Sequence, residues 1–154
     1  MARRAGRIVR IAVINGPNLN LLGQREPAIY GATTLAEIET RLRRVARELE
    51  TDISFSQFNG EGEIIDAIHA LKGTADGALI NAGAYTHTSL AIHDALTSVA
   101  VPFAEVHITN IYAREPERRK SVLADAAVAI IAGFGAMGYE LALRGLVGKL
   151  SRND

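Results

Sequence analysis

Cysteine and tryptophan are absent from this 154-residue sequence, and only 5% of its residues are aromatic. Without cysteine, the chain has no disulfide, no thiolate metal site and no cysteine nucleophile, which is typical of a reducing compartment, so we expect a cytoplasmic location. The chain also lacks net charge, because 17 basic and 17 acidic side chains balance. A neutral chain has no overall field that draws it to nucleic acid or to an acidic membrane, so neither is expected as a partner.

Long apolar runs are missing as well, and no stretch is long enough to span a bilayer. Arginines within residues 3–10 precede the apolar run 11–14 and superficially suggest a targeting signal. That run is too short for the core of a signal peptide, and the Asn-Gly-Pro turn at 15–17 ends it. We therefore interpret residues 1–7 as a flexible basic tail. Since 48% of the residues are hydrophobic, the chain can bury a core, and we expect one domain over residues 1–154.

Short β-branched runs alternate with segments of helical periodicity along the chain, a pattern typical of βα units wound on a parallel sheet. Strands are expected at residues 8–15, 53–58, 78–81, 103–108 and 128–132. Helices are expected at residues 34–49, 61–71, 89–98 and from Gly138 onward. The strand interiors are mostly apolar, as in strands that helices cover on both faces. The fold class is therefore α/β with a parallel sheet of five strands.

Two connections are longer than the usual loops of such a fold, residues 16–33 and residues 109–120. Both follow the carboxyl end of a strand, which is the edge where open α/β sheets bind ligands. In the strand order 2-1-3-4-5 the first, third and fourth strands are neighbours, so their carboxyl ends converge. Both connections mix turn formers, apolar anchors and polar tips, and we interpret them as the first and second lid over a ligand.

The first lid contains Arg25 and Tyr30, which are a candidate base with its activating cation. A free phenol titrates near pH 10, so its use as a base near neutrality requires about 4 kcal/mol of added stabilisation of the ionised form. One guanidinium at about 4 Å supplies a similar amount at an effective dielectric constant near 20. Taken alone, however, a tyrosine beside a glycine is more often a packing residue.

Polar side chains end the third and fourth strands. Strand alternation places Glu105 and His107 on one face, so the carboxylate can orient the imidazole and favour its protonated form, as in a general acid with its orienting partner. Asn81 ends the third strand and precedes His87 and several hydroxyls at the amino end of a helix, where anions are favoured. For the hydroxyls at 86, 88 and 89, an N-cap of that helix explains the pattern equally well.

Two further motifs are set aside. Residues 133–138 match G-x-G-x-x-G, but the chain has no following strand and no ribose-binding acid, so a tight turn with close helix packing explains them. The basic run 114–120 is interrupted by acids and has no interleaved aromatic residues, so it is interpreted as part of the second lid rather than as a nucleic-acid site.

From residue 11 to residue 150 the sequence resembles the type II 3-dehydroquinate dehydratases. The resemblance rests on N-G-P-N-L-N at 15–20, R-E-P at 25–27, Y-G at 30–31, N-A-G at 81–83, T-H-T-S at 86–89 and E-V-H-I at 105–108. It implies a flavodoxin-like three-layer sandwich with the strand order 2-1-3-4-5. It also implies an enzyme without metal or cofactor that assembles as a homododecamer, a tetramer of trimers.

The resemblance further implies a lyase that converts 3-dehydroquinate to 3-dehydroshikimate through an enolate, in the shikimate or quinate pathway. Tyr30, activated by Arg25, would remove the proton next to the ketone. Asn18 would stabilise the enolate through a water, and His107, held by Glu105, would protonate the departing hydroxyl. The expected substrate-binding residues are Asn81, Ile108 and Thr109 for the carboxylate, His87 and Arg118 for the ring hydroxyls, and Asp94 from a neighbouring subunit.

The second lid departs from the family pattern. Where the family usually has an aromatic residue before the arginine and a histidine after it, this chain has Glu117 and Arg119, and Thr109 replaces the usual serine. Whether Arg118 or Arg119 meets substrate therefore stays open. Two other functions also stay open: a non-catalytic flavodoxin-like binding module, such as an FMN carrier or a receiver domain, and a paralogue that acts on a related ring acid.

Overall fold

The computed structural model describes residues 7–24 and 26–152, and its centre is a five-stranded parallel sheet in the order β2-β1-β3-β4-β5. This confirms the predicted order. The strands are β1 (Arg10–Asn15), β2 (Asp52–Gln57), β3 (Gly77–Asn81), β4 (Phe103–His107) and β5 (Ala129–Ala132). Every predicted strand is present, and the bounds differ from the prediction by one or two residues because the inter-strand hydrogen bonds, rather than hydrophobicity, define where a strand ends.

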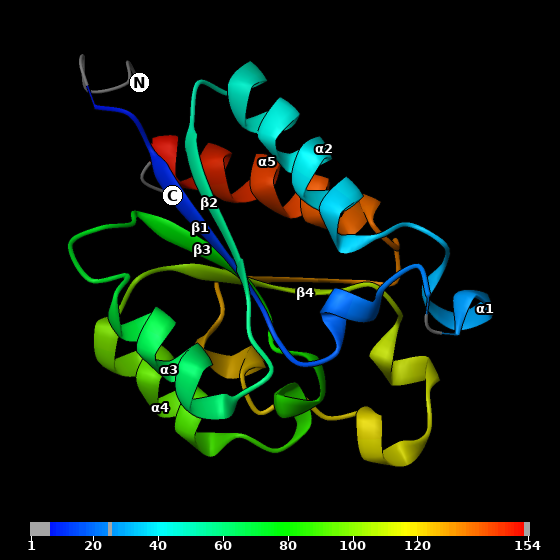
Figure 1. Ribbon diagram of the computed structural model, residues 1–154. Helices are drawn as coiled ribbons and strands as arrows, with labels where there is room; N and C mark the ends of the chain where they lie inside the picture. Colours follow the sequence, from blue (N-terminus) through cyan, green and yellow to red (C-terminus); the bar gives the residue numbers. More distant parts are fainter. Residues whose placement is uncertain (1–6, 25, 153–154) are drawn as a thin grey trace.

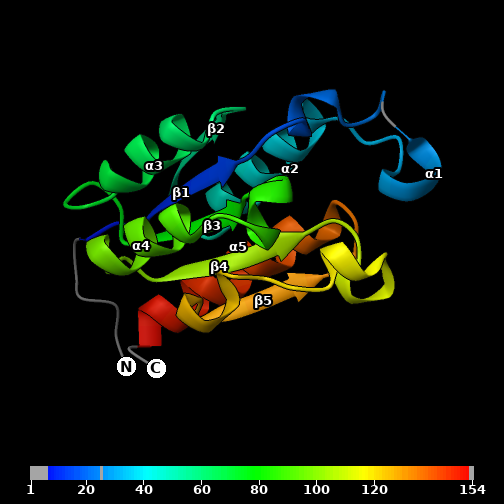
Figure 2. The same ribbon diagram turned by 90° about the horizontal axis from the view of Figure 1, so that it is seen from below.

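Helices cover both faces of the sheet in three layers, with α2 and α5 on one side and α3 and α4 on the other (Figures 1 and 2). The helices are α1 (Pro27–Tyr30), α2 (Leu35–Glu48), α3 (Glu61–His69), α4 (Leu90–Val99) and α5 (Met137–Arg152). Two predicted starts have identifiable caps. Thr34 Oγ1 accepts from the Glu37 amide at 3.2 Å, and Ser89 Oγ accepts from the Ile92 amide at 3.0 Å, so Ser89 is an N-cap.

The three central strands, β1, β3 and β4, are buried on both faces because alternate side chains enter different core clusters, whereas the edge strands β2 and β5 stay partly exposed. In β1, Val13 packs with Leu42 of α2 and Leu143 of α5, whereas the adjacent Ile14 packs with Ile64 of α3 and Ile92 of α4. A strand that is apolar at every position therefore has a partner for each side chain. Across the part of the chain that the structure describes, no helix is long and apolar enough to cross a membrane.

The glycine-rich connection at 133–138 is a tight turn between β5 and α5, as predicted. Gly133 and Gly135 have φ values of 101° and 61°, which a residue with a Cβ rarely adopts. The long connections hold more structure than expected. The first lid contains η1 (Leu19–Leu21) and α1, and the segment from β4 to β5 contains η3 (Ile111–Ala113), η4 (Pro116–Arg118) and η5 (Ala124–Ala126). Both lids lie at one end of the sheet (Figure 2).

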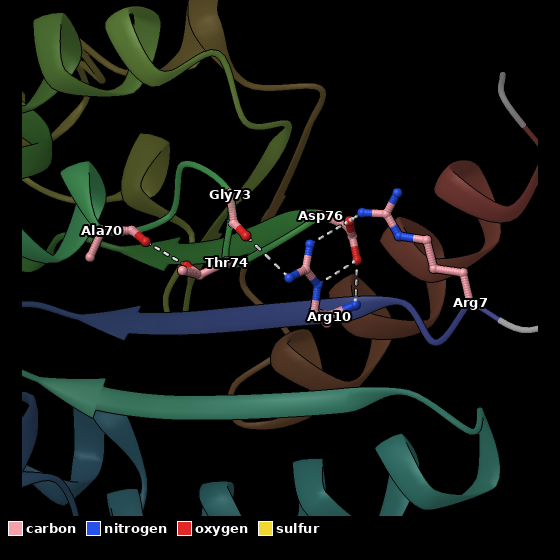
Figure 3. A network of polar contacts seen from close by, with 6 residues as sticks. All are labelled: Arg7, Arg10, Ala70, Gly73, Thr74 and Asp76. Carbon is pink, nitrogen blue, oxygen red and sulfur yellow. Dashed lines mark hydrogen bonds and ion pairs between the residues drawn. The ribbon is translucent and has the colours of Figure 1, made fainter.

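A cluster of charged side chains joins β1 to the start of β3 at the opposite, amino end of the sheet (Figure 3). Asp76 precedes β3 and accepts hydrogen bonds from the Arg10 amide at 2.8 Å, the Arg10 Nε at 3.3 Å and the Arg7 Nη2 at 2.7 Å. Arg10 Nη1 also donates to the Gly73 carbonyl at 3.3 Å, and the Thr74 hydroxyl donates to the Ala70 carbonyl. Of the predicted flexible tail, residue 7 is thus bound to the body, and residues 1–6 lie outside the described residues.

Partial burial alone would raise the pKa of Asp76. The hydrogen bonds from Arg10 and the positive charges of Arg10 and Arg7 outweigh that effect and hold the pKa of this carboxyl below its ordinary value of 3.8. The cluster therefore favours the ionised form of Asp76 in the folded protein.

Candidate active site

The carboxyl ends of β1, β3 and β4 surround a pocket of about 120 Å³, which we call the site pocket. Eight of the residues predicted for the site line it: Asn18, Tyr30, Asn81, His87, His107, Ile108, Thr109 and Arg118. A larger hollow of about 520 Å³ lies between β2 and α3, but none of the predicted site residues lines it. The chemistry-bearing side chains therefore gather at the smaller pocket, where the strand order brings three strand ends together.

The backbone after β1 passes so close to the end of β3 that position 16 must be glycine. The Gly16 amide donates to the Asn81 carbonyl at 2.7 Å, and a Cβ at this position would lie 2.5 Å from the backbone of Ala82. Asn18 has a φ of 67°, a left-handed conformation that asparagine tolerates. The backbone N–H of Asn18 donates to Asn59 Oδ1 at 3.1 Å. The first lid therefore leaves β1 tightly bound to the β3 end, and this positions Asn18 on the pocket wall.

The phenol of Tyr30 has a cationic partner in the second lid. Arg114 Nη1 donates to the Tyr30 hydroxyl at 2.9 Å, and the Arg114 guanidinium carbon lies 5.3 Å from the ring centroid. The Arg114 side chain is only 17% exposed, so water screens this charge incompletely. The predicted partner, Arg25, lies outside the described residues. Arg114 was missed as a site residue, although it belongs to the basic run assigned to the second lid.

The predicted contact between Glu105 and His107 is present. His107 Nε2 lies 2.7 Å from Glu105 Oε2, and the two side chains are 6% and 0% exposed. The second carboxylate oxygen, Oε1, accepts from the Ser121 hydroxyl at 2.6 Å. A buried carboxylate with a donor on each oxygen has its hydrogen-bonding needs met, so it can hold the imidazole in one orientation.

A buried chain of hydrogen bonds holds Asn81 from behind. Tyr139 of α5 donates its hydroxyl hydrogen to Asn15 Oδ1 at 2.7 Å and accepts from Asn81 Nδ2 at 2.8 Å. Asn15 Nδ2 donates to the Ser56 carbonyl at 3.0 Å, and Asn81 Oδ1 accepts from the Gly83 amide at 3.2 Å. These contacts fix which side of each amide is oxygen, so Asn81 can present its remaining N–H to the site pocket.

Sequence reasoning missed Tyr139 and assigned Asn15 to turn chemistry. Both residues are fully buried at 0% exposure. Burial raises the pKa of Tyr139 far above its ordinary value, even though the Asn81 hydrogen bond acts in the opposite direction. Tyr139 is therefore a neutral structural hydroxyl. No local pattern distinguishes it from an ordinary core tyrosine of an amphipathic helix.

The two arginines left undecided in the second lid have different positions. Arg118 lines the site pocket, and its Nε donates to Glu115 Oε1 at 2.5 Å. Arg119 instead turns back, and its Nε donates to the carbonyl of Arg114 at 2.5 Å. Arg118 is thus placed to meet a ligand, whereas Arg119 braces the lid backbone that carries Arg114.

The remaining predicted residues divide between pocket and surface. His87 lines the pocket, and its Nδ1 lies 2.7 Å from the Lys120 carbonyl. Asp94 lies on α4 with its side chain 82% exposed, 3.7 Å from His93, and it does not line this pocket. Thr86 is fully buried, and within the described residues its hydroxyl has no hydrogen-bond partner. Among those same residues, no group of three or more acidic or histidine side chains could hold a metal ion.

Fold and pocket together define an α/β enzyme built for acid–base chemistry: a phenol beside a guanidinium and an imidazole beside a carboxylate flank a small polar pocket. Comparison with known proteins gives the family. The family model described as Dehydroquinase class II matches residues 9–147, so the chain belongs to the class II dehydroquinase family. The family resemblance found in the sequence is thereby confirmed.

Individual relatives agree. The 3-dehydroquinate dehydratase of Gemmatimonas aurantiaca is 58% identical over 137 residues, which are 89% of this chain and 90% of the relative. The 3-dehydroquinate dehydratase of Tolumonas auensis is 54% identical over 145 residues, 94% of this chain and 95% of the relative. The crystal structure of type II dehydroquinase from Butyrivibrio crossotus superimposes with a TM-score of 0.88 at 41% identity, covering 90% of this chain and 97% of the other.

Proposed function

We infer that this chain is a 3-dehydroquinate dehydratase, a lyase of the shikimate pathway that converts 3-dehydroquinate to 3-dehydroshikimate. The observation that carries the inference is that Tyr30 and His107 line one small pocket, each held by a partner suited to it, Arg114 and Glu105. Dehydration next to a ketone needs a base for the carbon-bound proton and an acid for the hydroxyl that departs.

In the proposed reaction, the ionised phenol of Tyr30 takes the proton next to the ketone, and the electrons of that C–H bond form an enolate. Asn18 stabilises the enolate oxygen through a water. The enolate then expels the ring hydroxyl, which takes a proton from His107 and leaves as water. Arg114 supports the base because a nearby positive charge favours the phenolate form. We keep Arg25 as a second cation for this role on the strength of the family resemblance.

The same pocket offers groups for the polar substituents of the substrate. We propose that Asn81, with the backbone and side chain at Ile108 and Thr109, binds the carboxylate, and that His87 and Arg118 bind the ring hydroxyls. In support, all of these residues line the site pocket, and the Tyr139 chain orients the Asn81 amide. No metal or cofactor takes part in this scheme.

We propose that residues 16–33 and 109–120 act as lids on a single domain. The hydrogen bond between Tyr30 and Arg114 joins the two segments at the pocket that both residues line. Closure around a substrate would exclude water and strengthen the interaction of both charged pairs with the reacting groups.

We also propose self-association as a homododecamer, a tetramer of trimers, in which Asp94 reaches the site of a neighbouring subunit. Two observations support association: Asp94 is exposed outside its own pocket, and apolar side chains are exposed at the β5 edge and the start of α5. These apolar residues are Val128, Ile130, Phe134 and Met137, with exposed fractions of 41% to 68%. Large apolar side chains exposed close together in the sequence are typical of subunit contacts.

Sedimentation measures the assembly, and subunit mixing tests the shared site. Tyr30→Phe and Asp94→Ala chains, each inactive alone, should recover activity after dissociation and joint reassembly, since some sites then combine an intact Tyr30 with an intact Asp94. If the mixture stays inactive while assembling normally, Asp94 does not complete a neighbouring site. We propose a cytoplasmic location from the cysteine-free sequence, which cell fractionation tests.

Mixing the purified protein with 3-dehydroquinate, after dialysis against a chelator, should produce the ultraviolet absorbance of the enone product. Tyr30→Phe should abolish this signal and leave the circular dichroism spectrum unchanged. Silence from a well-folded wild-type sample would refute the proposed reaction. A panel of related ring acids tests the alternative that the protein is a paralogue acting on a different substrate. This alternative matters because a 3-dehydroquinate dehydratase-like protein of Bifidobacterium longum shares this fold at a TM-score of 0.70 and 26% identity.

A further inference from the structure

Ser121 follows the second lid, and its hydroxyl makes three contacts. It donates to Glu105 Oε1 at 2.6 Å, and it accepts from the amides of Leu123 at 3.2 Å and Ala124 at 3.1 Å. A serine hydroxyl has one hydrogen and two lone pairs. Since both amides can only donate, they occupy the lone pairs, and the single hydrogen is directed at Glu105.

This assignment constrains the next contact along the chain of hydrogen bonds. Glu105 Oε1 must accept from Ser121, and Oε2 lies 2.7 Å from His107 Nε2. An ionised carboxylate accepts at both oxygens, so in that form the hydrogen of this contact lies on His107 Nε2. The Nδ1 atom of His107 is then the ring nitrogen left for the site pocket. Ser121 thereby supports the acceptor state of the carboxylate that holds the His107 ring through Nε2.

The neighbouring residues act on the other histidine of the pocket. The Lys120 carbonyl lies 2.7 Å from His87 Nδ1, and because a carbonyl only accepts, Nδ1 carries the hydrogen and Nε2 is left for the pocket. The Val122 amide donates to the Thr86 carbonyl at 2.8 Å, so this segment is also hydrogen-bonded to the residue that precedes His87. Residues 120–122 thus connect the end of the second lid to both histidines.

We propose that Ser121 is a positioning residue for the acid step, acting through Glu105 to keep a hydrogen on His107 Nε2. The imidazolium then gives its Nδ1 proton to the departing hydroxyl and is left as the neutral Nε2–H tautomer. The proposal rests on the proposed dehydration. It also gives the second lid two tasks, because Arg114 in that lid contacts the base Tyr30 and the residue directly after the lid holds the partner of the acid.

Replacing Ser121 by alanine tests this proposal. Ser121→Ala should lower kcat by about tenfold or more while KM changes little, because the acid group is misplaced but the binding groups remain. Ser121→Thr, which keeps a hydroxyl at the same position, should restore most of the activity. Thr74→Ala is the matched control, since it removes a hydroxyl at the opposite, amino end of the sheet and should leave kcat near that of the wild type.

A double-mutant cycle separates positioning from a loss of folding. If Ser121 acts through Glu105, adding Ser121→Ala to Glu105→Gln should cost no further activity. The proposal is overturned if the two substitutions lower kcat by factors that multiply in the double mutant. It is also overturned if Ser121→Ala alone leaves kcat unchanged. The cycle compares kcat values at a temperature where circular dichroism shows all four proteins folded. A loss of folded protein therefore does not contribute to the result.

Nitrogen-15 NMR of labelled histidine tests the same contact without catalysis. The neutral wild-type His107 should give the pattern of one tautomer with hydrogen on Nε2, and Ser121→Ala should give a mixture. A pure Nε2–H pattern in Ser121→Ala would show that Glu105 needs no help from the hydroxyl. Because this measurement uses no substrate, a protein that failed to dehydrate 3-dehydroquinate would refute the proposed function and still report on the Ser121 contact.

Discussion

The guanidinium of Arg114 donates to the hydroxyl of Tyr30 at 2.9 Å although the two residues are 84 positions apart. The contact joins the two lids and places a positive charge on the candidate base. A cation there stabilises the phenolate, which is the form that can accept a proton.

Replacing Arg114 by glutamine should lower kcat by about ten- to a hundredfold, since a loss of roughly 1.4 to 2.7 kcal/mol of phenolate stabilisation changes the rate by this factor. Arg114→Lys keeps the charge and should lose less. Steady-state kinetics compare the two variants, and an unchanged kcat in Arg114→Gln would remove Arg114 from base activation.

The two adjacent arginines of the second lid should differ in kinetics. Arg118→Ala should raise KM by about tenfold or more, because it removes a charged donor from the pocket wall. Arg119→Ala should have a much smaller effect on KM, since its guanidinium contacts the carbonyl of Arg114 rather than the pocket. Equal effects of the two changes on KM would show that the substrate meets both side chains.

Tyr139→Phe should lower the free energy of unfolding by about 1 to 3 kcal/mol, because it leaves the amides of Asn15 and Asn81 buried without their shared partner. KM should rise as well, since Asn81 loses its fixed orientation. Chemical denaturation and steady-state kinetics measure the two effects. If stability fell while KM stayed constant, the Tyr139 chain would support the fold without orienting Asn81.

The pH dependence of the same variant has a definite sign. The pKa of Tyr139 is higher in the folded protein than in the unfolded chain, so its stabilising contribution is complete below about pH 10 and declines as the pH rises further. The stability difference between wild type and Tyr139→Phe should therefore narrow above about pH 10. Denaturation at pH 8 and at pH 10.5 compares the two proteins.

Asp76 should show the opposite sign at the amino end of the sheet. Its pKa is lower in the folded protein, so its stabilising contribution is present above the ordinary value of 3.8 and declines as the pH falls through the lower folded value. Asp76→Asn should cost about 1 kcal/mol at pH 7 and progressively less below pH 4. Glu39→Gln, which removes an exposed ion pair with Arg43, is a control expected to cost less.

Some contacts followed from local rules and were predictable. Glu105 and His107 are two positions apart in one strand, so the alternation of side chains placed them on the same face. The N-cap at Thr34 and the glycine turn at 133–138 likewise depend on residues close in the sequence. The unexpected helix α1 begins at Pro27, a residue common at the first helical position, but one short turn gives too little periodicity to detect.

By itself, then, the sequence determined the order of helices and strands, the family resemblance and the strand ends that carry polar residues, because each of these is written in spacings of a few residues or in short motifs. Only the tertiary structure decided that Arg114 contacts Tyr30, that Arg118 rather than Arg119 lines the pocket, and that Ser121 and Tyr139 hold Glu105 and Asn81. Apart from the arginine pair, these contacts join segments distant in the sequence. They depend on how each lid bends and on which side chains the packed core leaves within reach, and no periodicity encodes that.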